Sequence, residues 1–306
     1  MKRSEKAQAL PWIGRDSTQA VLMLLPMLIG FVVFTYFPIF YIMRYAFFIF
    51  NGVNTPTFNG IGHFVRIFQR DRQFWESFLN TMILSGGKLA IEIPLALFLA
   101  VLLQQRGSGA GFFRVALFLP TIISTAIVGL VFSLMFASYH GVINAILEGV
   151  HLIKAPIDWQ GGKWTALLMI GLASIWAYVG INMIFFLMAL QGVPQELYEC
   201  ATLDGCMGFS RFVRITLPMI GPIFRVVLLN AIIGSLKVTD LVLSSTNGQP
   251  GGTTDVVMTY VFKFFMGRNG QRTDVGYASA MSVVTGIVLA AVSFLYLRAS
   301  KKMDMD

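Results

Sequence analysis

The sequence predicts an all-α membrane protein with about six transmembrane helices, on the evidence of its composition and its long uncharged runs. Of the 306 residues, 56% are hydrophobic and only 12% are charged, whereas an ordinary soluble domain has roughly 25% charged residues. A helix that crosses a bilayer needs about 20 mostly apolar residues. Four runs reach that length without a charged side chain: Ser17–Met43, Val115–Phe136, Trp164–Leu190 and Gly276–Leu297.

The first uncharged run predicts a span over residues 19–48, which follows a basic segment, residues 1–18. That segment holds Lys2, Arg3 and Lys6, as the start of a secretory signal peptide would. However, the apolar run behind it is too long for a signal core, and no clear small-residue cleavage site follows it. We therefore expect the run to stay in the protein as the first transmembrane helix.

The second span is predicted over residues 78–104, with its helix beginning earlier, within the mixed stretch Asp71–Asn80. Two charged side chains, Lys88 and Glu92, interrupt its apolar character. They lie four residues apart, on one face of a helix, where they can form an ion pair. We expect a mutually neutralising pair that faces a partner helix. An ion or proton relay is the alternative, but no further carboxylate or histidine continues such a chain.

Span three is predicted over residues 112–137 and span four over residues 164–190. The outer loop between them contains a weakly amphipathic piece, Val142–Ile153. Because amphipathic helices lie flat at an interface, we expect this piece on the membrane surface or under a partner protein.

Span five is predicted over residues 221–245 and span six over residues 276–298, followed by a charged tail at residues 299–306. Span five contains Lys237 and Asp240, three residues apart. They can pair on one helix face, which is the simplest way to keep two charges within a span. If they are not paired, Lys237 is free to meet an acidic sugar or a phosphate.

Residues 191–220 lie between two spans but are rich in Glu, Asp, Arg and Gly. The stretch Gln195–Leu203 predicts a short helix, because a proline precedes it and an acidic residue stands in its first turn. Gly205 and Gly208 end that helix, and Phe209–Ile215 predicts a second short segment. The loop is therefore expected to form a helix–turn–helix parallel to the membrane, on one face of the protein.

The spacing within this loop follows the pattern Glu-Ala-Ala, three residues, Gly, nine residues, Ile, one residue, Leu-Pro. The positions that match are Glu199, Ala201, Gly205, Ile215, Leu217 and Pro218, with Cys200 in place of the first Ala. The pattern resembles the EAA loop of ATP-binding-cassette (ABC) importer permeases. The resemblance implies a type I ABC importer permease fold, in which the cytoplasmic loop docks on a separate ATPase subunit and both termini are cytoplasmic.

Further stretches resemble the carbohydrate-uptake, maltose-permease-type branch of that family. They are Phe58–Ile61, Phe74–Thr81, Gly141–Asn144, Val193–Gly205, Ser235–Pro250, Tyr260–Phe265 and Gly276–Ala280. The resemblance implies a subunit that translocates a sugar or oligosaccharide by alternating access in a bacterial or archaeal cytoplasmic membrane. The partners it implies are a second, homologous permease subunit in a heterodimer, a cytoplasmic ATPase dimer, an extracytoplasmic solute-binding protein and membrane lipid.

By the same resemblance, the ATPase-coupling loop is expected to act through Glu199, Ala201, Asp204, Gly205, Ile215, Leu217 and Pro218. Glu199 is expected to pair with a basic group of the ATPase or to cap backbone donors, and Asp204 to tie down the loop. The candidates for the substrate path are Ser174, Trp176, Tyr178, Ser235, Leu236 and Lys237. Trp176 and Tyr178 lie two residues apart and face different directions on a helix, so at most one is expected to stack on sugar.

No catalytic centre is predicted within this chain. The sequence has no Gly-x-x-x-x-Gly-Lys-Ser/Thr run to hold ATP phosphates, so ATP and Mg are expected on the partner ATPase. His63, His140 and His151 lack ligand-like spacing, and Cys200 and Cys206 are expected to be reduced thiols. We therefore expect neither a metal site nor another cofactor in this chain.

Other functional classes are compatible with parts of the sequence. An ABC permease for a peptide, a polyamine or an anion would carry the same coupling loop. A secondary transporter or a channel is expected to show an internal repeat or a chain of buried carboxylates, and the sequence has neither. The net charge of +8 suits cytoplasmic loops beside anionic lipid and does not require a nucleic acid. The residues leave both neutral and acidic sugars open.

Overall fold

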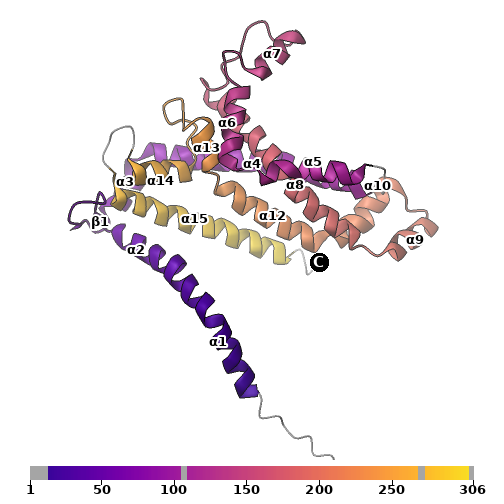
Figure 1. The fold of residues 1–306 in the computed structure, drawn as a ribbon, viewed down its shortest axis with the longest axis horizontal. Helices are drawn as coiled ribbons and strands as arrows, with labels where there is room; N and C mark the ends of the chain where they lie inside the picture. Colours follow the sequence, from indigo (N-terminus) through magenta and orange to yellow (C-terminus); the bar gives the residue numbers. More distant parts are fainter. Residues whose placement is uncertain (1–12, 105–108, 268–272, 303–306) are drawn as a thin grey trace, which may run out of the picture.

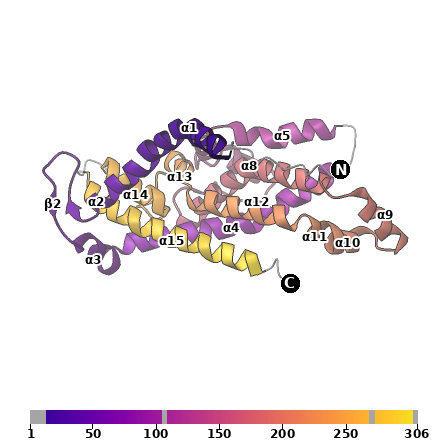
Figure 2. The ribbon, with the colours of Figure 1, turned by 90° about the horizontal axis from the view of Figure 1, so that it is seen from below.

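Four helices lie side by side and form the body of the molecule (Figures 1 and 2). They are α4 (Arg72–Gln104), α8 (Lys163–Gln191), α12 (Gly221–Leu236) and α15 (Val275–Lys302). The computed structural model describes residues 13–104, 109–267 and 273–302. The parts of the predicted terminal segments at residues 1–12 and 303–306 lie outside the described residues. The long apolar helices confirm the predicted all-α membrane class.

The N-terminal span runs away from this bundle as one rod of three helical pieces (Figure 1). The pieces are α1 (Ile13–Phe31), a π-helical turn η1 (Val32–Tyr36) and α2 (Phe37–Tyr45). Pro38 lacks a backbone donor and its ring crowds the carbonyl four residues before it, which explains why the helix widens just ahead of it. No residue in the most apolar window of this rod is buried.

The predicted end of span one at residue 48 is wrong, because the helix stops at Tyr45 and the chain turns into a β-hairpin. Strand β1 (Phe48–Ile49) pairs antiparallel with β2 (Thr57–Phe58). The Asn51 side chain accepts two backbone hydrogen bonds, of 3.1 and 2.9 Å, which stabilise the turn of the hairpin. The hairpin lies at one end of the bundle together with α3 (Gly62–Gln69) (Figure 1).

Helix α4 begins one residue after Asp71, within the stretch where the sequence predicts its start. The Asp71 carboxylate accepts a hydrogen bond from the amide of Phe74 (2.9 Å) and so caps the first turn. It also accepts hydrogen bonds from the hydroxyls of Tyr260 (3.0 Å) and Tyr277 (2.5 Å). These bonds join α4 to α14 (Val257–Met266) and to α15 at the hairpin end of the bundle.

Span three is not the continuous helix predicted over residues 112–137. It consists of α5 (Ala110–Ile122) and α6 (Thr125–Met135), which are bent by 97°. The Thr-Ile-Ile-Ser-Thr run at the break lowers helix propensity. Helix α6 rises from the side of the bundle and leads to the outer helix α7 (Val142–Gly149) (Figure 1).

Span five is also interrupted, and the continuous helix predicted over residues 221–245 is wrong. Helix α12 ends early, and α13 (Asp240–Ser245) starts after three residues that are not helical. The β-branched pair Val238–Thr239 disfavours a helix, while the acidic Asp240 is favourable in the first turn of the next one. The chain then forms α14 within residues 246–275, between the predicted spans five and six.

Spans four and six keep the predicted extents closely. Helix α8 is one residue longer at each end than the predicted 164–190. Helix α15 begins one residue before the predicted 276–298 and continues to Lys302. Both are long, uninterrupted apolar runs, which is the pattern from which a helix is most directly predicted.

Two glycines let the broken spans approach their neighbours closely. A Cβ on Gly180 of α8 would lie 2.1 Å from the carbonyl oxygen of Leu117 on α5. A Cβ on Gly129 of α6 would lie 2.0 Å from the hydroxyl oxygen of Ser244 on α13. Since small residues let helix backbones pack closely in membranes, these two positions hold α5 on α8 and α6 on α13.

Candidate functional site

The loop with the EAA-type spacing folds into two short helical arms at one end of the bundle (Figure 1). The first arm is α9 (Gln195–Leu203), with the bounds predicted from the sequence. The second arm consists of α10 (Gly208–Arg211), the π-helical turn η2 (Phe212–Thr216) and α11 (Leu217–Met219). We call residues 195–219 the coupling segment. Its second arm meets α12 at a bend of 73°, and the C-terminal end of α15 lies at the same end of the bundle (Figures 1 and 2).

The turn between the two arms depends on glycine. Gly205 has a φ of 72° and Gly208 a φ of 56°, in the left-handed region where other residues are strained. The amide of Cys206 donates a hydrogen bond to the carbonyl of Ala201 (2.7 Å), which closes the end of α9. Gly205 therefore stands where α9 ends, as the sequence predicts, whereas Gly208 is the first residue of α10 and does not end the first helix.

Tyr198 joins the two arms, a contact that the sequence analysis did not anticipate. Its hydroxyl lies 3.1 Å from the hydroxyl oxygen of Thr216, at the end of η2. The guanidinium of Arg211 lies 5.3 Å from the centroid of its ring, within the range of a cation–π interaction. Since Thr216 is 18 residues away in sequence, spacing could not reveal this contact. The two arms therefore form one unit.

The predicted coupling residues differ in exposure. Ala201 is buried, with 4% of its surface exposed, and Ile215 and Leu217 are half-buried. Glu199 and Pro218 are exposed. Within the described residues, the Glu199 carboxylate accepts a side-chain hydrogen bond from Gln195 on its own helix (3.2 Å) and caps no backbone donor. Glu199 thus presents its charge to the outside of the chain.

Asp204 does not tie down the loop within the chain, contrary to expectation. Its side chain is exposed and makes no hydrogen bond or ion pair with any residue that the structure describes. Asp204 only caps the end of α9 through its backbone amide, which donates to the carbonyl of Cys200 (3.0 Å). The contact between Tyr198 and Thr216 anchors the loop instead.

A second region of interest lies where the two broken spans meet α8. Helices α5, α6 and α13 all contact α8, and α13 also packs on α6. Irregular backbone within a membrane is tolerated only where it is buried in protein or lines a cavity, and transporters commonly bind substrate at such interrupted helices. The middle of α8, beside these breaks, carries three of the predicted path residues.

The three path residues of α8 differ in accessibility. Ser174 is fully buried, and its hydroxyl makes no hydrogen bond to the described residues. Trp176 is 42% exposed, with its ring centroid 5.7 Å from that of Phe132 on α6. Tyr178 is half-buried and packs in the apolar cluster that contains Val238 at the α12–α13 break. The two aromatic rings are therefore the accessible members on this helix.

Of the three path residues at the end of α12, two are buried. Ser235 donates its hydroxyl to the carbonyl of Ala231 (2.7 Å), and Leu236 is packed in the interior. Lys237 is exposed, at the position where the helix stops. Of these three residues, only Lys237 is therefore accessible at the surface of the chain.

The ion pair predicted between Lys237 and Asp240 is not formed. Both side chains are exposed, and they are not joined by any of the ion pairs within the described ranges. The break explains this result, because the pairing geometry at a spacing of three requires a continuous helix. Lys237 is left as an exposed cation beside the interrupted span.

Lys88 and Glu92 form the predicted ion pair, and it lies inside the bundle. The ammonium and the Oε2 atom of Glu92 are 3.3 Å apart, and the two side chains are 4% and 1% exposed. The pair faces α8, as predicted. The side-chain amide of Asn182 donates to Oε1 of Glu92 (2.5 Å), and the Lys88 ammonium lies 4.3 Å from the ring centroid of Tyr178. Asn182 was missed, although an amide within an uncharged span is a signal of a buried polar contact.

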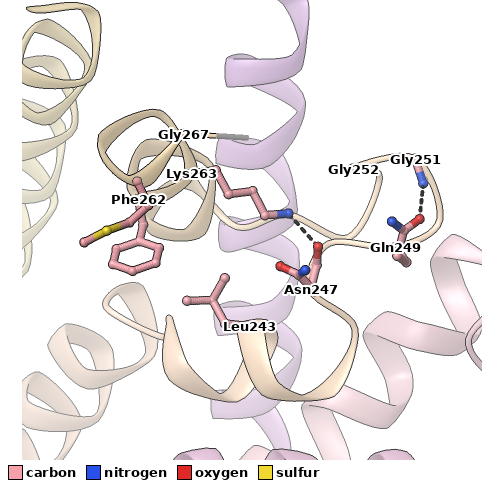
Figure 3. A pocket seen from close by; sticks show the side chains of 9 residues that line it. Leu243, Asn247, Gln249, Gly251, Gly252, Phe262, Lys263 and Gly267 are labelled. Carbon is pink, nitrogen blue, oxygen red and sulfur yellow. Dashed lines mark hydrogen bonds between the residues drawn. The ribbon is translucent and has the colours of Figure 1, made fainter. Parts of the chain in front are cut away.

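A small cavity of about 300 Å³ lies between α13, α14 and the loop that joins them (Figure 3). Asn247, Gln249 and Phe262 are among the residues that line it. The ammonium of Lys263 donates to the carbonyl of Asn247 (2.5 Å) and to the carboxylate of Asp255 (2.8 Å). These bonds tie α14 to the Asn-Gly-Gln-Pro-Gly-Gly turn.

The described histidines and cysteines do not gather into a metal-binding group. No group of three or more His, Cys, Asp or Glu residues in the described ranges could hold a metal ion. His63 is buried in α3, with Nε2 3.0 Å from the carbonyl oxygen of Phe48. Cys200 and Cys206 are free thiols on the coupling segment.

Comparison with known proteins identifies the class to which this architecture belongs. Residues 92–304 match the family described as the binding-protein-dependent transport system inner membrane component, and the chain belongs to this family. The trehalose/maltose transport system permease protein MalF of Thermococcus litoralis is 30% identical over 290 residues, which cover 94% of this chain and 95% of that protein. The lactose transport system permease protein LacF of Rhizobium radiobacter is 33% identical over 251 residues, with coverages of 80% and 82%.

Solved structures agree with this assignment. A chain of a bacterial ABC transporter involved in the import of the acidic polysaccharide alginate matches with a TM-score of 0.80 and 27% identity, over 95% of this chain and 97% of its own. A bacterial alginate ABC transporter in complex with an alginate pentasaccharide-bound periplasmic protein matches with a TM-score of 0.81 and 26% identity, over 96% and 98%. These likenesses confirm the predicted ABC importer permease fold.

Proposed function

We propose that this chain is a permease subunit of an ABC importer that carries a sugar or oligosaccharide across the cytoplasmic membrane by alternating access. One observation carries the proposal: the EAA-type residues lie on a folded two-arm segment at one end of the bundle, in a chain of an importer-permease family. The sugar class is supported by relatives named for trehalose/maltose and lactose and by structures named for alginate. The chain itself is a non-catalytic subunit.

The proposed assembly contains a second, homologous permease, an ATPase dimer that binds ATP and Mg, and an extracytoplasmic solute-binding protein. A solute-binding partner is supported by the alginate transporter structure that contains a periplasmic protein. Both termini are proposed to be cytoplasmic. The common position of the coupling segment and the C-terminal end of α15 supports this orientation for the C-terminal end (Figure 1).

Coupling is proposed to run from α9 to the substrate path through one continuous mechanical connection. Closure of the ATPase dimer moves α9 as a rigid piece, because Tyr198 and Thr216 lock it to the second arm. The second arm continues through the 73° bend into α12, and α12 ends at the break beside Lys237. Glu199, exposed on α9, is available to pair with a basic group of the ATPase.

The exposed Lys237 supports an acidic sugar as one substrate class. A lysine beside the path attracts the carboxylate of a uronate, and the polysaccharide named for the similar structures is acidic. Neutral disaccharides are named for the two relatives. Transport assays should therefore compare an acidic with a neutral oligosaccharide.

Affinity purification from native membranes tests the proposed assembly. A tagged chain is expected to bring down a second permease and an ATPase, identified by mass spectrometry. Glu199→Ala is expected to lower the ATPase recovered several-fold, because one partner of an interfacial charge pair is lost. Glu148→Ala, which removes an exposed carboxylate from α7, is the matched control and is expected to have no effect.

One outcome of this purification would refute the importer proposal. A wild-type chain that purifies alone or as a homo-oligomer, under conditions that preserve a control importer, would refute the importer proposal. It would favour a secondary transporter or a channel.

A further inference from the structure

Four polar side chains form a connected group between α4 and α8. We call this group the polar ladder, and its members are Lys88, Glu92, Tyr178 and Asn182. Tyr178 and Asn182 lie four residues apart on α8, so they share one face of that helix. Lys88 and Glu92 have the same spacing on α4. The ladder therefore has two rungs, Lys88 to Tyr178 and Glu92 to Asn182.

The contacts of the ladder form one chain that ends on an aromatic ring. Asn182 donates to Glu92 (2.5 Å), and Glu92 pairs with Lys88 (3.3 Å). The Lys88 ammonium then lies 4.3 Å from the centroid of the Tyr178 ring. A desolvated ammonium over an aromatic face is attracted by the ring quadrupole, so Lys88 limits the orientations that this ring can take.

Packing alone does not explain the charged pair. Desolvating two charges is costly, and replacing a buried ion pair by apolar residues of similar volume is often neutral or stabilising. The free-energy cost of desolvation is especially high for charges within a membrane span. Such charges therefore usually mark functional sites. An apolar pair could join α4 to α8 equally well, but it could not hold a cation under an aromatic ring.

Tyr178 is the member of the ladder that reaches the proposed path. Lys88, Glu92 and Asn182 are all buried, whereas Tyr178 is half-buried. Its ring packs in the cluster that includes Val238, in the break between α12 and α13. The ladder thus connects a fully enclosed charge pair to an aromatic side chain beside an interrupted span.

We propose that Lys88, held by Glu92 and Asn182, is a positioning residue that fixes the Tyr178 ring for contact with the sugar in the path. The proposal rests on the proposed function, because it requires a saccharide to pass this ring. With one face occupied by the ammonium, the ring offers its free edge and hydroxyl in one orientation. A ring that is already ordered loses less conformational entropy when the sugar makes contact.

The first experiment measures the ring without any substrate. A 3-fluorotyrosine is placed at position 178 of the purified complex, and its ¹⁹F spectrum is compared between wild type and the double variant Lys88→Met/Glu92→Gln. The double variant is expected to shift and broaden the signal, and Lys88→Arg with Glu92 retained is expected to preserve it. The matched control is Arg72→Met/Glu76→Gln, an exposed pair with the same spacing on the same helix. A spectrum unchanged in the Lys88→Met/Glu92→Gln complex would overturn the proposal.

The second experiment measures coupling between transport and ATP hydrolysis in proteoliposomes. The probes are labelled maltotriose and an alginate trisaccharide, each with its solute-binding protein. The number of sugar molecules imported per ATP hydrolysed is expected to fall about tenfold in Lys88→Met/Glu92→Gln. Without the cation–π contact, the oriented state of the ring would be populated about tenfold less. Tyr178→Leu is expected to cause the same fall, and combining it with the double variant should add nothing.

The outcomes separate the two proposals. Falls that multiply when the variants are combined would show that Lys88 acts independently of Tyr178 and would overturn the positioning role. A wild-type complex that imports neither sugar would contradict the sugar class in the proposed function. The ¹⁹F comparison would still test whether Lys88 fixes the ring.

Discussion

At the scale of single residues, the coupling segment depends on backbone conformation as well as on side-chain chemistry. Gly205 has a φ of 72°, and nothing lies within 4 Å of the place where its Cβ would stand. A larger residue at this position would meet no steric clash. The left-handed backbone conformation alone would cost it roughly 1–2 kcal/mol of stability. Conformation explains why the EAA pattern has a glycine at this position.

Gly205→Ala is expected to destabilise the end of α9 by about 1 kcal/mol and to speed hydrogen exchange across the coupling segment. Gly221→Ala is the matched control, because Gly221 also has open space around its Cβ but no positive φ. Hydrogen–deuterium exchange of the two variants, read by mass spectrometry, measures the difference. Equal exchange in the coupling segment of both would show that backbone strain is not the reason for the glycine.

Residue spacing in the sequence reveals those members of the site that lie on one segment, and it misses those that act through partners on other elements. Glu199, Gly205 and Pro218 lie at fixed intervals along one segment, so their pattern is visible before folding. Tyr198 and Asn182 act through partners on other elements, Thr216 and Glu92 respectively. An isolated tyrosine carries no signal of such a partner, and an asparagine within an uncharged span indicates a buried polar contact but not the residue that it meets.

At the scale of elements, the two interrupted spans are the main difference from the predicted fold. The run Val115–Phe136 carries no charged residue across the α5–α6 break, so its length and composition predict one straight span. The bend of 97° comes from local residues of low helix propensity and from packing on α8. The break after α12 likewise separates Lys237 from Asp240, which a continuous helix would have paired.

The close approach of α5 to α8 gives a test at this scale. Gly180→Ala is expected to destabilise the protein by about 1–3 kcal/mol, because the new methyl group would meet the Leu117 carbonyl oxygen at 2.1 Å. Gly171→Ala on the same helix is the control, since its nearest neighbour, a Leu84 methyl group, lies at an ordinary 3.7 Å. Thermal unfolding in detergent measures both. A Gly180→Ala protein as stable as Gly171→Ala would mean that the two helices can move apart at no cost.

At the scale of the whole molecule, the bundle has one end with the coupling segment and an opposite end with the hairpin, α3 and α14 (Figure 1). The N-terminal rod lies outside the bundle, with no buried residue in its most apolar window. A helix long enough to cross a membrane that exposes apolar side chains on all sides is not stable in water. It therefore requires lipid or another membrane subunit around it, in agreement with a chain that works in an assembly.

The two ends of the molecule should lie on opposite sides of the membrane. In sealed right-side-out vesicles, a membrane-impermeant maleimide is expected to leave the native thiol Cys200, exposed on α9, unlabelled until the vesicles are opened. Lys154→Cys, in a chain with both native cysteines changed to serine, is expected to react at once, because residue 154 is exposed in the outer loop. The reverse pattern would invert the proposed orientation.

The sequence by itself determined the membrane class, the bounds of α8 and α9, the Lys88–Glu92 pair and the spacing of the coupling residues. Each of these depends on composition, on one uninterrupted apolar run or on a pattern within one segment of the chain, so local physics is sufficient. Only the tertiary structure decided where spans three and five break, which path residues are exposed, and that Tyr198 and Asn182 join separate elements. The exposures and the two joining contacts depend on residues far apart in the chain, and the local residues of low helix propensity at the breaks permit a bend without showing that packing will produce one.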